Sequence, residues 1–421
     1  MLKQYFKQAW RLLKENPVLS AISIIGTALA ICMIMVMVMS HQVKNAPYPP
    51  ETNRDRMLYV NYMKVIMKNN KGQASGGISS KLIKECFKPL QTAEIVAMVA
   101  HSYPALATIP ASNKARNYDR MFTDETFWKV FDFSFIAGKP YTKEDVDAAL
   151  HKVVISERVA REIFNSTDVV GKTILLDYHD YMVCGVVKDV SLLARAAYSQ
   201  IWLPYTLKNM DMDDMRGQYS AYILAHSKSD FPKIKEEAEV LRNKYNASLA
   251  SDREVDYMEQ PDTQFAYNHR TGSSEAPDLK RSVIQYAITI LLLLLVPAVN
   301  LSSMTGSRMR KRLSELGVRR AFGATHRNLF SQILWESMMQ TLVGGLLGLA
   351  LSFFASYLLK DMIYGFNAYR LGNASIDFGA LFKPATFVYA LLFCMVLNVL
   401  SSFVPAWRIS RKQIVNAIHS N

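Results

Sequence analysis

Four long apolar runs decide what this 421-residue chain can fold into. Residues 18–40, 283–304 and 385–407 contain no charged side chain, and residues 332–359 contain only Glu336. A helix that crosses the hydrocarbon core of a membrane needs roughly 20 apolar residues, and each run supplies them. The sequence therefore predicts four membrane-spanning helices.

The first run could instead be a cleaved secretory signal, because four basic residues precede it. Its apolar stretch, however, exceeds the roughly 7–15 residues of a signal peptide. The tripeptide Met39-Ser40-His41 also lacks the small residues of a cleavage site. We therefore expect an uncleaved membrane anchor.

Charge indicates the topology of these spans. Residues 1–17, 305–330 and 408–421 together contain fourteen Lys and Arg against two acidic residues, whereas residues 41–282 contain 32 basic and 31 acidic residues. Basic residues near the ends of a span stay in the cytoplasm, so both termini are predicted inside and 41–282 outside. The net charge of +13 is then a signal of topology, and basic residues that follow membrane boundaries argue against nucleic-acid binding.

The predicted fold class is an α-helical membrane protein with four transmembrane helices and a large α+β extracytoplasmic domain inserted between the first and second spans. The expected segments follow in chain order: a basic cytoplasmic tail (1–17), first span (18–40), outside domain (41–282), second span (283–304), cytoplasmic loop (305–330), third span (331–359), short outside loop (360–384), fourth span (385–407) and cytoplasmic tail (408–421).

Within the outside domain, β-rich runs alternate with helical ones, which favours an α+β class. The run TILLDYHDYMVCGVVKD predicts a hairpin that turns at Tyr178-His179. The stretch FPKIKEEAEVLRNKY has apolar residues at helical spacing, which predicts a helix with a core-facing side. That side is formed by Phe231, Ile234, Ala238 and Leu241.

The sequence shows no arrangement typical of catalysis or metal binding. Of the four cysteines, Cys86 and Cys184 lie in the outside domain; a bridge between them is conceivable in an oxidising compartment, and two buried free thiols are favoured. No nucleophile, acid–base pair or metal-ligand spacing is recognisable. The one Gly-Lys-Thr, at Gly171, lacks the glycine that a phosphate-binding loop has five positions earlier, where Ser166 stands. We expect no catalytic residue, metal or cofactor in this chain.

The cytoplasmic loop carries the most informative pattern. Glu315 precedes Arg319 by four residues on a helical stripe, while Val318 and Phe322 lie on another. Residues 323–325 break this helix, and a new helix is expected from about residue 328. From spacing alone, a lipid-surface anchor and a docking site for a partner protein are equally open.

This stretch resembles a known family. The run ELGVRRAFGA at 315–324, followed by Gln332, Glu336 and the glycines Gly344-Gly345-x-x-Gly348, resembles the FtsX/MacB-type permease of ABC transporters. In that family the stretch docks on the ATPase. The resemblance thus implies ATPase coupling by Glu315, Leu316, Gly317, Arg319, Arg320, Ala321, Gly323 and Ala324.

The resemblance extends over most of the chain. The opening KQAWRLLKENPVLSAISIIGTALAI, the run KVVISERVAREIFNSTDVVGKTILLDYHDYMVCGVVKDV and the ending PAWRISRKQIVNAI are similar to the family, although Gln413 stands where many relatives have proline. Residues 61–120 and 205–280 match only loosely. The implied outside domain resembles the MacB-type periplasmic core domain, with an α+β lobe interrupted by a β-rich lobe near 120–200.

By this resemblance the chain is a permease subunit, in the bacterial inner membrane, that couples ATP hydrolysis to movement of its periplasmic domain. The implied partners are a separate ABC ATPase that holds ATP and Mg²⁺, a second permease subunit and membrane lipid, with a periplasmic adaptor and outer-membrane channel as further candidates. Two alternatives stay open: an FtsX-like regulator of cell-wall hydrolases, and a membrane sensor or binding protein.

Two features of the third span have simple structural interpretations. Glu336, an acid inside a span, is a functional hypothesis by default, but its place near the cytoplasmic end favours hydrogen bonding at the interface or accepting a hydrogen bond from an Arg of the coupling helix. Gly344, Gly345 and Gly348 form a face of small residues that allows close helix packing.

Overall fold

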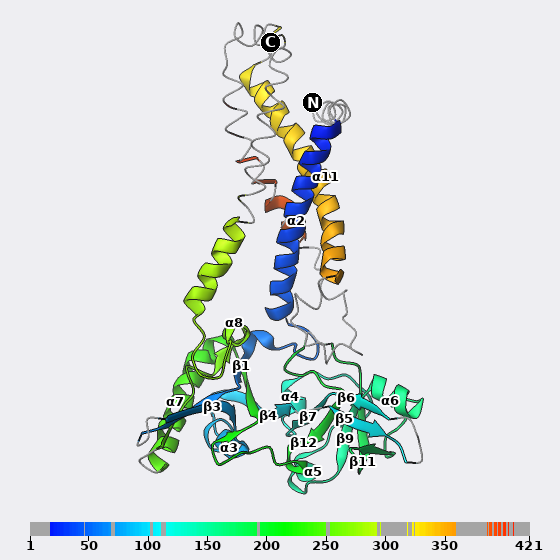
Figure 1. Ribbon diagram of the computed structural model, residues 1–421, viewed down its shortest axis with the longest axis vertical. Coiled ribbons are helices and arrows are strands. Elements are labelled where there is room, and N and C mark those ends of the chain that lie inside the picture. The colour runs from blue at the N-terminus through cyan, green and yellow to red at the C-terminus, as the bar shows by residue number, and fades with distance from the viewer. Residues whose placement is uncertain are drawn as a thin grey trace. The chain divides into compact units, whose positions relative to one another are not determined.

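The structure is a computed structural model. It describes residues 17–45, 47–68, 72–101, 104–110, 115–191, 194–249, 253–292, 295, 318, 322–323, 325–358, 385, 387–389, 391–393, 395–396, 399–400, 403 and 407. The chain divides into two compact units (Figure 1). The helical unit comprises Met1–Val43, Arg281–Asn367 and Phe378–Asn421, and the α+β unit comprises Lys44–Lys280 and Ala368–Asp377.

Two described helices of the helical unit are long and apolar enough to cross a membrane. Ser20–Gln42 lies within α2 (Pro17–Asn45), and Arg327–Leu358 lies within α11 (His326–Leu358). They correspond to the first and third predicted spans. Residues 279–292 and the described residues between 385 and 407 are also helical. The other two predicted spans lie partly outside the described residues, so the number of four spans stays a prediction.

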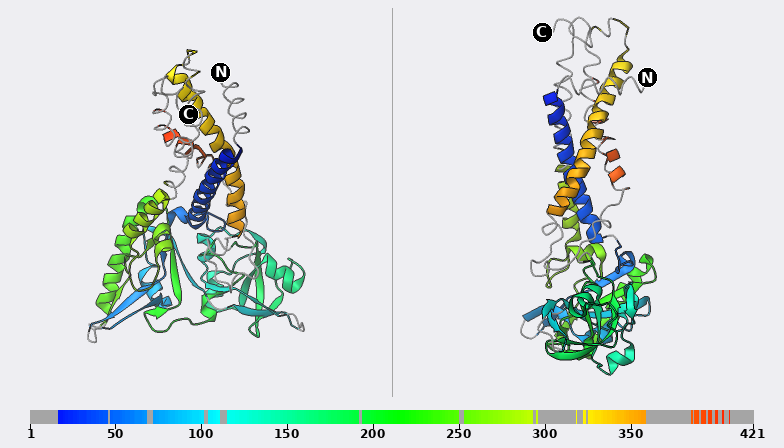
Figure 2. Two further views of the ribbon diagram at one scale, coloured as in Figure 1. Left: turned by 45° about the horizontal axis from the view of Figure 1, so that its top comes forward. Right: turned by 90° about the vertical axis from the view of Figure 1, so that its right-hand side faces the viewer.

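Helices α2 and α11 pack closely where α11 has glycines (Figure 2). A Cβ atom added to Gly344 would lie 2.9 Å from Cβ of Thr27, and one added to Gly348 would lie 2.6 Å from the carbonyl oxygen of Ala28. Small residues allow the backbones of membrane helices to approach this closely. The α2 side of the contact buries Ile31, Met35 and Met39.

The α+β unit has sixteen described strands that join in one sheet. They are β1 (Met57–Val60), β2 (Met63–Met67), β3 (Gly72–Ile78), β4 (Ala93–His101), β5 (Ala105–Thr108), β6 (Arg116–Tyr118), β7 (Arg120–Thr123), β8 (Phe135–Gly138), β9 (Lys152–Ser156), β10 (Thr173–Leu176), β11 (His179–Val187), β12 (Ile201–Pro204), β13 (Arg216–Gly217), β14 (Tyr219–Ala225), β15 (Arg253–Asp256) and β16 (Asp262–Thr263). Its α-helices are α3 (Ser80–Cys86), α4 (Phe127–Val130), α5 (Lys143–Asp147), α6 (Glu157–Phe164), α7 (Phe231–Ser248) and α8 (Gln264–His269), and its 3₁₀ turns are η1 (Arg54–Arg56), η2 (Tyr205–Leu207) and η3 (Lys228–Asp230).

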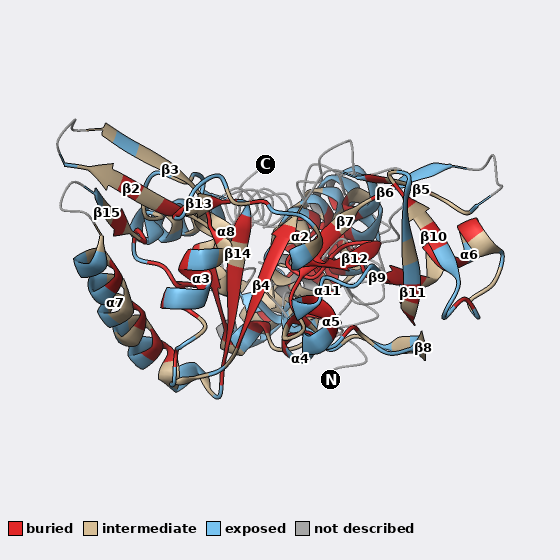
Figure 3. Ribbon diagram, turned by 90° about the horizontal axis from the view of Figure 1, so that it is seen from below, coloured by how far each residue is buried: buried red, intermediate tan, exposed pale blue. Residues whose placement is uncertain are grey.

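Strands β4 and β14 pair antiparallel, from Tyr219 with Ala100 to Ala225 with Ala93, and divide the sheet into two lobes (Figure 3). One lobe contains β1–β3 and β13–β16, and the other contains β5–β12, joined to β4 through β7. The second lobe is inserted in the chain between β4 and β14, as the resemblance implied. It is β-rich, and its first strand begins at Ala105, earlier than the implied boundary near 120.

The predicted hairpin is present, but its turn lies one residue earlier than predicted. Leu176 of β10 pairs with His179 of β11, so the two turn residues are Asp177 and Tyr178. Both have positive φ, 49° and 70°. Two-residue turns with positive φ match the twist of a hairpin, and aspartate tolerates this conformation, so Asp177 and not His179 takes the turn position.

The predicted helix with a core-facing side is confirmed as α7. Phe231, Ile234 and Ala238 are buried in the hydrophobic core, and Leu241 packs against it partly buried. Helix α6 begins after a capping serine, because the Ser156 side chain accepts a hydrogen bond from the Val159 N–H at the first turn.

Candidate functional site

The predicted ATPase-coupling residues lie largely outside the described residues. Of the eight, only Gly323 is described, together with its neighbour Phe322 and the earlier Val318. The Phe322 N–H donates to the carbonyl of Val318 at 3.1 Å, which is a helical bond, and Gly323 then has φ +92°. A glycine in this left-handed conformation is a common end of a helix, so the predicted break is confirmed at Gly323.

The next helix begins immediately after this glycine. The Thr325 hydroxyl accepts a hydrogen bond from the Asn328 N–H at 3.2 Å, and α11 starts at His326, two residues before the predicted start. Phe322 is 88% exposed and Val318 is 47% exposed. The described part of the loop is thus a helix end, a tight turn with an exposed aromatic ring, and the capped start of a 33-residue helix. The side chain of Glu336, further along α11, lies outside the described part.

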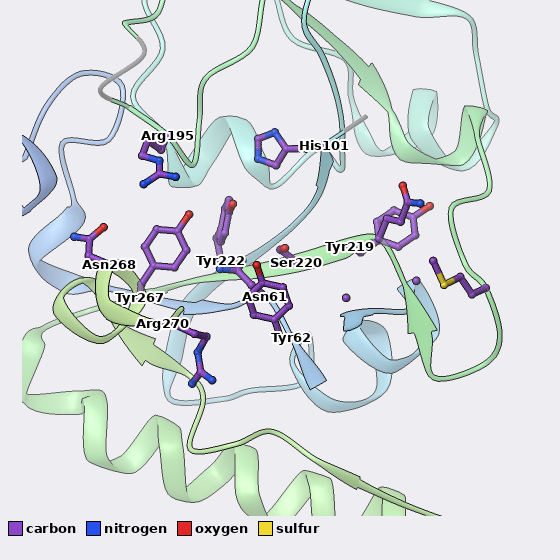
Figure 4. Close-up of a pocket in the computed structure, with 14 residues that line it drawn as sticks. Asn61, Tyr62, His101, Arg195, Tyr219, Ser220, Tyr222, Tyr267, Asn268 and Arg270 are labelled. Atoms are coloured by element: carbon purple, nitrogen blue, oxygen red, sulfur yellow. The ribbon is translucent and has the colours of Figure 1, made fainter. Parts of the chain in front are cut away.

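A pocket of about 460 Å³ opens in the α+β unit, at a place where the sheet splits (Figure 4). Strand β1 pairs with β14 along Met57–Val60, whereas β2, which follows it, pairs with β3. Strand β3 pairs with β14 only at Ile78 and Tyr219. The pocket is lined chiefly by tyrosines and side-chain amides, among them Asn61, Tyr62, Gln218, Tyr219, Tyr222 and Tyr267.

Gln260 fixes the wall of the pocket that carries Asn61 and Tyr62. Its Oε1 accepts hydrogen bonds from the Asn61 and Tyr62 N–H groups at 2.8 and 3.3 Å, and its Nε2 donates to the Tyr62 carbonyl at 2.6 Å. The side chain is 2% exposed. A buried amide with both ends hydrogen-bonded is a rigid support, so the link between β1 and β2 is held in one conformation.

Two glycines allow β3 and β13 to meet beside the pocket. A Cβ atom on Gly77 would lie 2.6 Å from the Gly217 carbonyl oxygen, and one on Gly217 would lie 2.7 Å from the Ile78 carbonyl oxygen. Since real Cβ atoms do not approach a carbonyl so closely, only glycine fits at both positions.

The turn that carries Arg195 is held by the buried carboxylate of Glu51. One oxygen accepts hydrogen bonds from the Ala196 and Ala197 N–H groups at 2.7 and 3.0 Å, and the other accepts from Nε of Arg54 at 2.5 Å. Glu51 and Arg54 are both 2% exposed. Both oxygens of Glu51 are therefore bonded to groups of the protein itself. The side chain of Arg195 lines the pocket.

Aromatic rings support the same end of the pocket. Tyr267 stacks on Tyr59 with ring centroids 4.5 Å apart, and Tyr59 meets Tyr222 edge to face at 5.5 Å. Burial raises the pKa of the Tyr222 and Tyr267 hydroxyls, so both stay protonated and can donate hydrogen bonds at neutral pH.

The sequence interpretation identified none of these pocket residues. Asn61 and its support Gln260 are 199 positions apart, and only sheet pairing brings them together. Among the described residues, no three His, Cys, Asp or Glu side chains lie close enough together to hold a metal ion.

Comparison with known proteins decides the family. The model of the MacB-like periplasmic core domain matches residues 20–241, more than half of the chain, and the model of the FtsX-like permease C-terminal domain matches residues 287–414. The chain belongs to the MacB/FtsX-like permease family. The α+β unit is accordingly a MacB-like periplasmic domain, and α2 and α11 are the candidate membrane helices of the permease.

Individual relatives are distant. "Macrolide export ATP-binding/permease protein MacB 1" of Yersinia pestis is 22% identical over 414 residues, 97% of this chain and 59% of the relative. MacB of Escherichia coli K12 is 23% identical over 296 residues, 69% of this chain and 42% of the relative. The chain thus spans about 59% or less of the length of these curated relatives.

Two similar solved structures are an extracellular and a periplasmic domain. The extracellular domain of the noncanonic ABC-type transporter YknZ from Gram-positive bacteria is 15% identical with a TM-score of 0.34, covering 47% of this chain and all of that domain. The periplasmic region of MacB from Actinobacillus actinomycetemcomitans is 18% identical with a TM-score of 0.34, covering 47% of this chain and 88% of that region.

In this periplasmic domain Cys86 and Cys184 are free thiols. Burial raises the pKa of Cys86 to about 11 and that of Cys184 to about 12. Since the thiolate is the reactive form, we expect neither cysteine of the native protein to react appreciably with iodoacetamide at pH 8, and both to react in urea.

Mass spectrometry of peptides containing each cysteine measures this directly. Raising the pH from 7 to 9 should increase labelling of the native protein little, because both thiols stay protonated below their raised pKa values. Rapid native labelling of Cys86 at pH 8 would contradict its burial in α3.

Proposed function

We propose that this chain is the permease subunit of an ABC transporter whose ATP is hydrolysed by a separate ATPase chain. The observation that carries the proposal is the turn at Phe322-Gly323, an exposed aromatic residue between two helix ends, within a match to the FtsX-like permease model. An apolar side chain exposed on a short helix, with basic residues in the flanking sequence, suits a groove on a partner protein.

The geometry of the helical unit supports transmission of force. Helix α11 begins at His326, three residues after Gly323, and continues for 33 residues, so a displacement at the turn would move it as a rigid rod. The glycines Gly344 and Gly348 engage α2 too closely for the helices to slide freely. Helix α2 leads by chain connection into the periplasmic domain at Lys44.

We infer the following cycle. ATP-driven closure of the ATPase moves residues 315–324, α11 and α2 follow, and the periplasmic domain changes position to act on periplasmic cargo. Two permease subunits, identical or related, would serve one ATPase dimer, with both termini in the cytoplasm. A periplasmic adaptor and an outer-membrane channel would extend the path for export. The curated relatives named above are described as macrolide exporters, and export is the activity we propose here.

The test is affinity purification of the tagged chain from its native membrane in mild detergent, followed by mass spectrometry. Wild type should retain an ABC ATPase, and Arg319→Glu should reduce its recovery about tenfold or more, because reversing a charge at a docked interface costs several kcal/mol. Gly323→Pro, which cannot adopt positive φ, should have a similar effect.

Arg411→Glu is the matched control, since it reverses a cytoplasmic basic residue outside the docking stretch. It should leave ATPase recovery close to wild type. Recovery of an intact membrane complex that contains no ATPase would instead favour a sensor or scaffold.

A further inference from the structure

One end of the periplasmic pocket combines a cation with phenol hydroxyls. Figure 4 shows Tyr222 and Tyr267 with their hydroxyl ends turned toward the end of the pocket where Arg195 and His101 lie. Burial is the largest cause of the raised pKa of both tyrosines; the positive charge of Arg195 lowers both pKa values, and the negative charge of Glu51 raises them. The three side chains therefore share one small volume.

Arg195 differs from the neighbouring arginines because it forms no ion pair with a carboxylate of the described residues. No described carboxylate lies within ion-pair distance of it. By contrast, Arg270 at the other side of the pocket donates to both oxygens of Asp262, at 2.6 and 3.0 Å. The nearby carboxylate of Glu51 is already occupied by Arg54 and two backbone N–H groups. One positive charge is left at the pocket.

The Tyr222 hydroxyl is the second uncommitted group. This side chain is 2% exposed, and no described residue forms a hydrogen bond with its hydroxyl. The hydroxyl is aimed into the pocket, where a bound oxyanion could accept its hydrogen bond.

We propose that this pocket binds a small, hydroxyl-rich molecule with one oxyanion group, carboxylate or phosphate, held by Arg195, Tyr222 and Tyr267. The acidic monosaccharides are the simplest members of this class. The volume of about 460 Å³ lies in the range of small-molecule sites. The amides of Asn61 and Gln218 suit hydroxyl groups, and the ring of Tyr62 suits the C–H side of a sugar ring.

The alternative is a purely structural role, in which Tyr222 is a core aromatic residue and Arg195 is a solvated surface charge. It explains the ring of Tyr222, which contacts Tyr59 and Phe131. It does not explain why Gln260, Glu51 and the glycine pair hold three separate chain segments rigidly around an open, polar cavity. Rigid support around convergent polar groups is what a binding site requires.

The experiment is calorimetric titration of the full-length chain in detergent with D-glucuronate, glucose 6-phosphate and glucose. Both anions should bind at least about tenfold more tightly than neutral glucose, since charge-assisted hydrogen bonds are the stronger ones. Arg195→Gln should weaken binding of both anions about tenfold and leave binding of glucose unchanged. Tyr222→Phe, which keeps the ring, should weaken binding of both anions several-fold.

Lys172→Gln removes an exposed cation outside the pocket and should change nothing. Binding of one anion but not the other identifies the group, carboxylate or phosphate. The proposal is overturned if neither anion binds at concentrations up to about 10 mM, or if binding is the same in Arg195→Gln and Tyr222→Phe as in wild type. The measurement contains no ATPase, so its failure and that of the proposed transporter role are separate results.

Discussion

Replacing Glu51 by leucine is expected to be the most damaging single change in the periplasmic domain. The substitution leaves the Arg54 guanidinium, which is 2% exposed, without its carboxylate, and leaves the Ala196 and Ala197 N–H groups without an acceptor. Breaking a buried ion pair by removing one partner costs about 3–5 kcal/mol. The turn that carries Arg195 should therefore open much more often.

Hydrogen–deuterium exchange of the intact protein, read by mass spectrometry, measures this opening. A cost of about 3 kcal/mol corresponds to exchange roughly a hundredfold faster at Ala196 and Ala197. Glu51→Gln should be intermediate, because its carbonyl still accepts hydrogen bonds while its charge is lost.

The control is Glu94→Ala. Glu94 pairs with Arg56, but the two side chains are 37% and 29% exposed, and exposed pairs contribute at most about 1 kcal/mol. Its effect on exchange at 196–197 should be negligible. If Glu51→Leu exchanged there like Glu94→Ala, Glu51 would not be the support of this turn.

Replacing Gly348 by leucine should disrupt the helical unit. Even a single Cβ at this position would lie 2.6 Å from the Ala28 carbonyl oxygen and 2.9 Å from Cβ of Ile31. The contacting atoms are backbone and the first atom of a side chain, which cannot turn away, so α2 and α11 would have to separate. Overpacking of this kind costs about 1–3 kcal/mol, and a bulky leucine lies at the upper end.

Size-exclusion chromatography after extraction in mild detergent gives the readout. We expect the monodisperse fraction of Gly348→Leu to fall about tenfold, and that of Gly348→Ala to fall less. Leu346→Val, at an exposed position of the same helix, should match wild type. Equal monodisperse fractions of Gly348→Leu and Leu346→Val would show that the packing of α2 and α11 does not depend on this contact.

Much of the fold could be predicted because its signals are local. The apolar runs predict α2 and α11, and helical spacing predicts the buried face of α7 at Ile234 and Ala238. The local pattern predicts the hairpin turn one residue late, because Asp177 adopts the positive φ that this turn position needs. The start of the inserted lobe is set by sheet pairing beyond β4, which no local pattern encodes.

The pocket could not be predicted, since its supports are non-local. Gln260, Glu51 and Arg195 carry no distinguishing pattern in the sequence, and their roles appear only when segments far apart in the chain are brought together. Most of its lining also comes from residues 61–120 and 205–280, where the family resemblance is loose. The coupling residues, by contrast, were predicted from sequence resemblance and stay a prediction apart from the turn at Gly323.

The pairing of β4 with β14 has a consequence for how such a protein can diversify. The chain leaves the first lobe at the end of β4 and returns through β13 into β14, where Ala100 and Tyr219 are direct neighbours across the ladder. The whole intervening lobe is therefore a cassette with adjacent ends, an arrangement in which domain insertions are tolerated. Cassettes of different length or shape could be exchanged at this junction during evolution while the register of the host sheet, and its connection to the membrane helices, stayed the same.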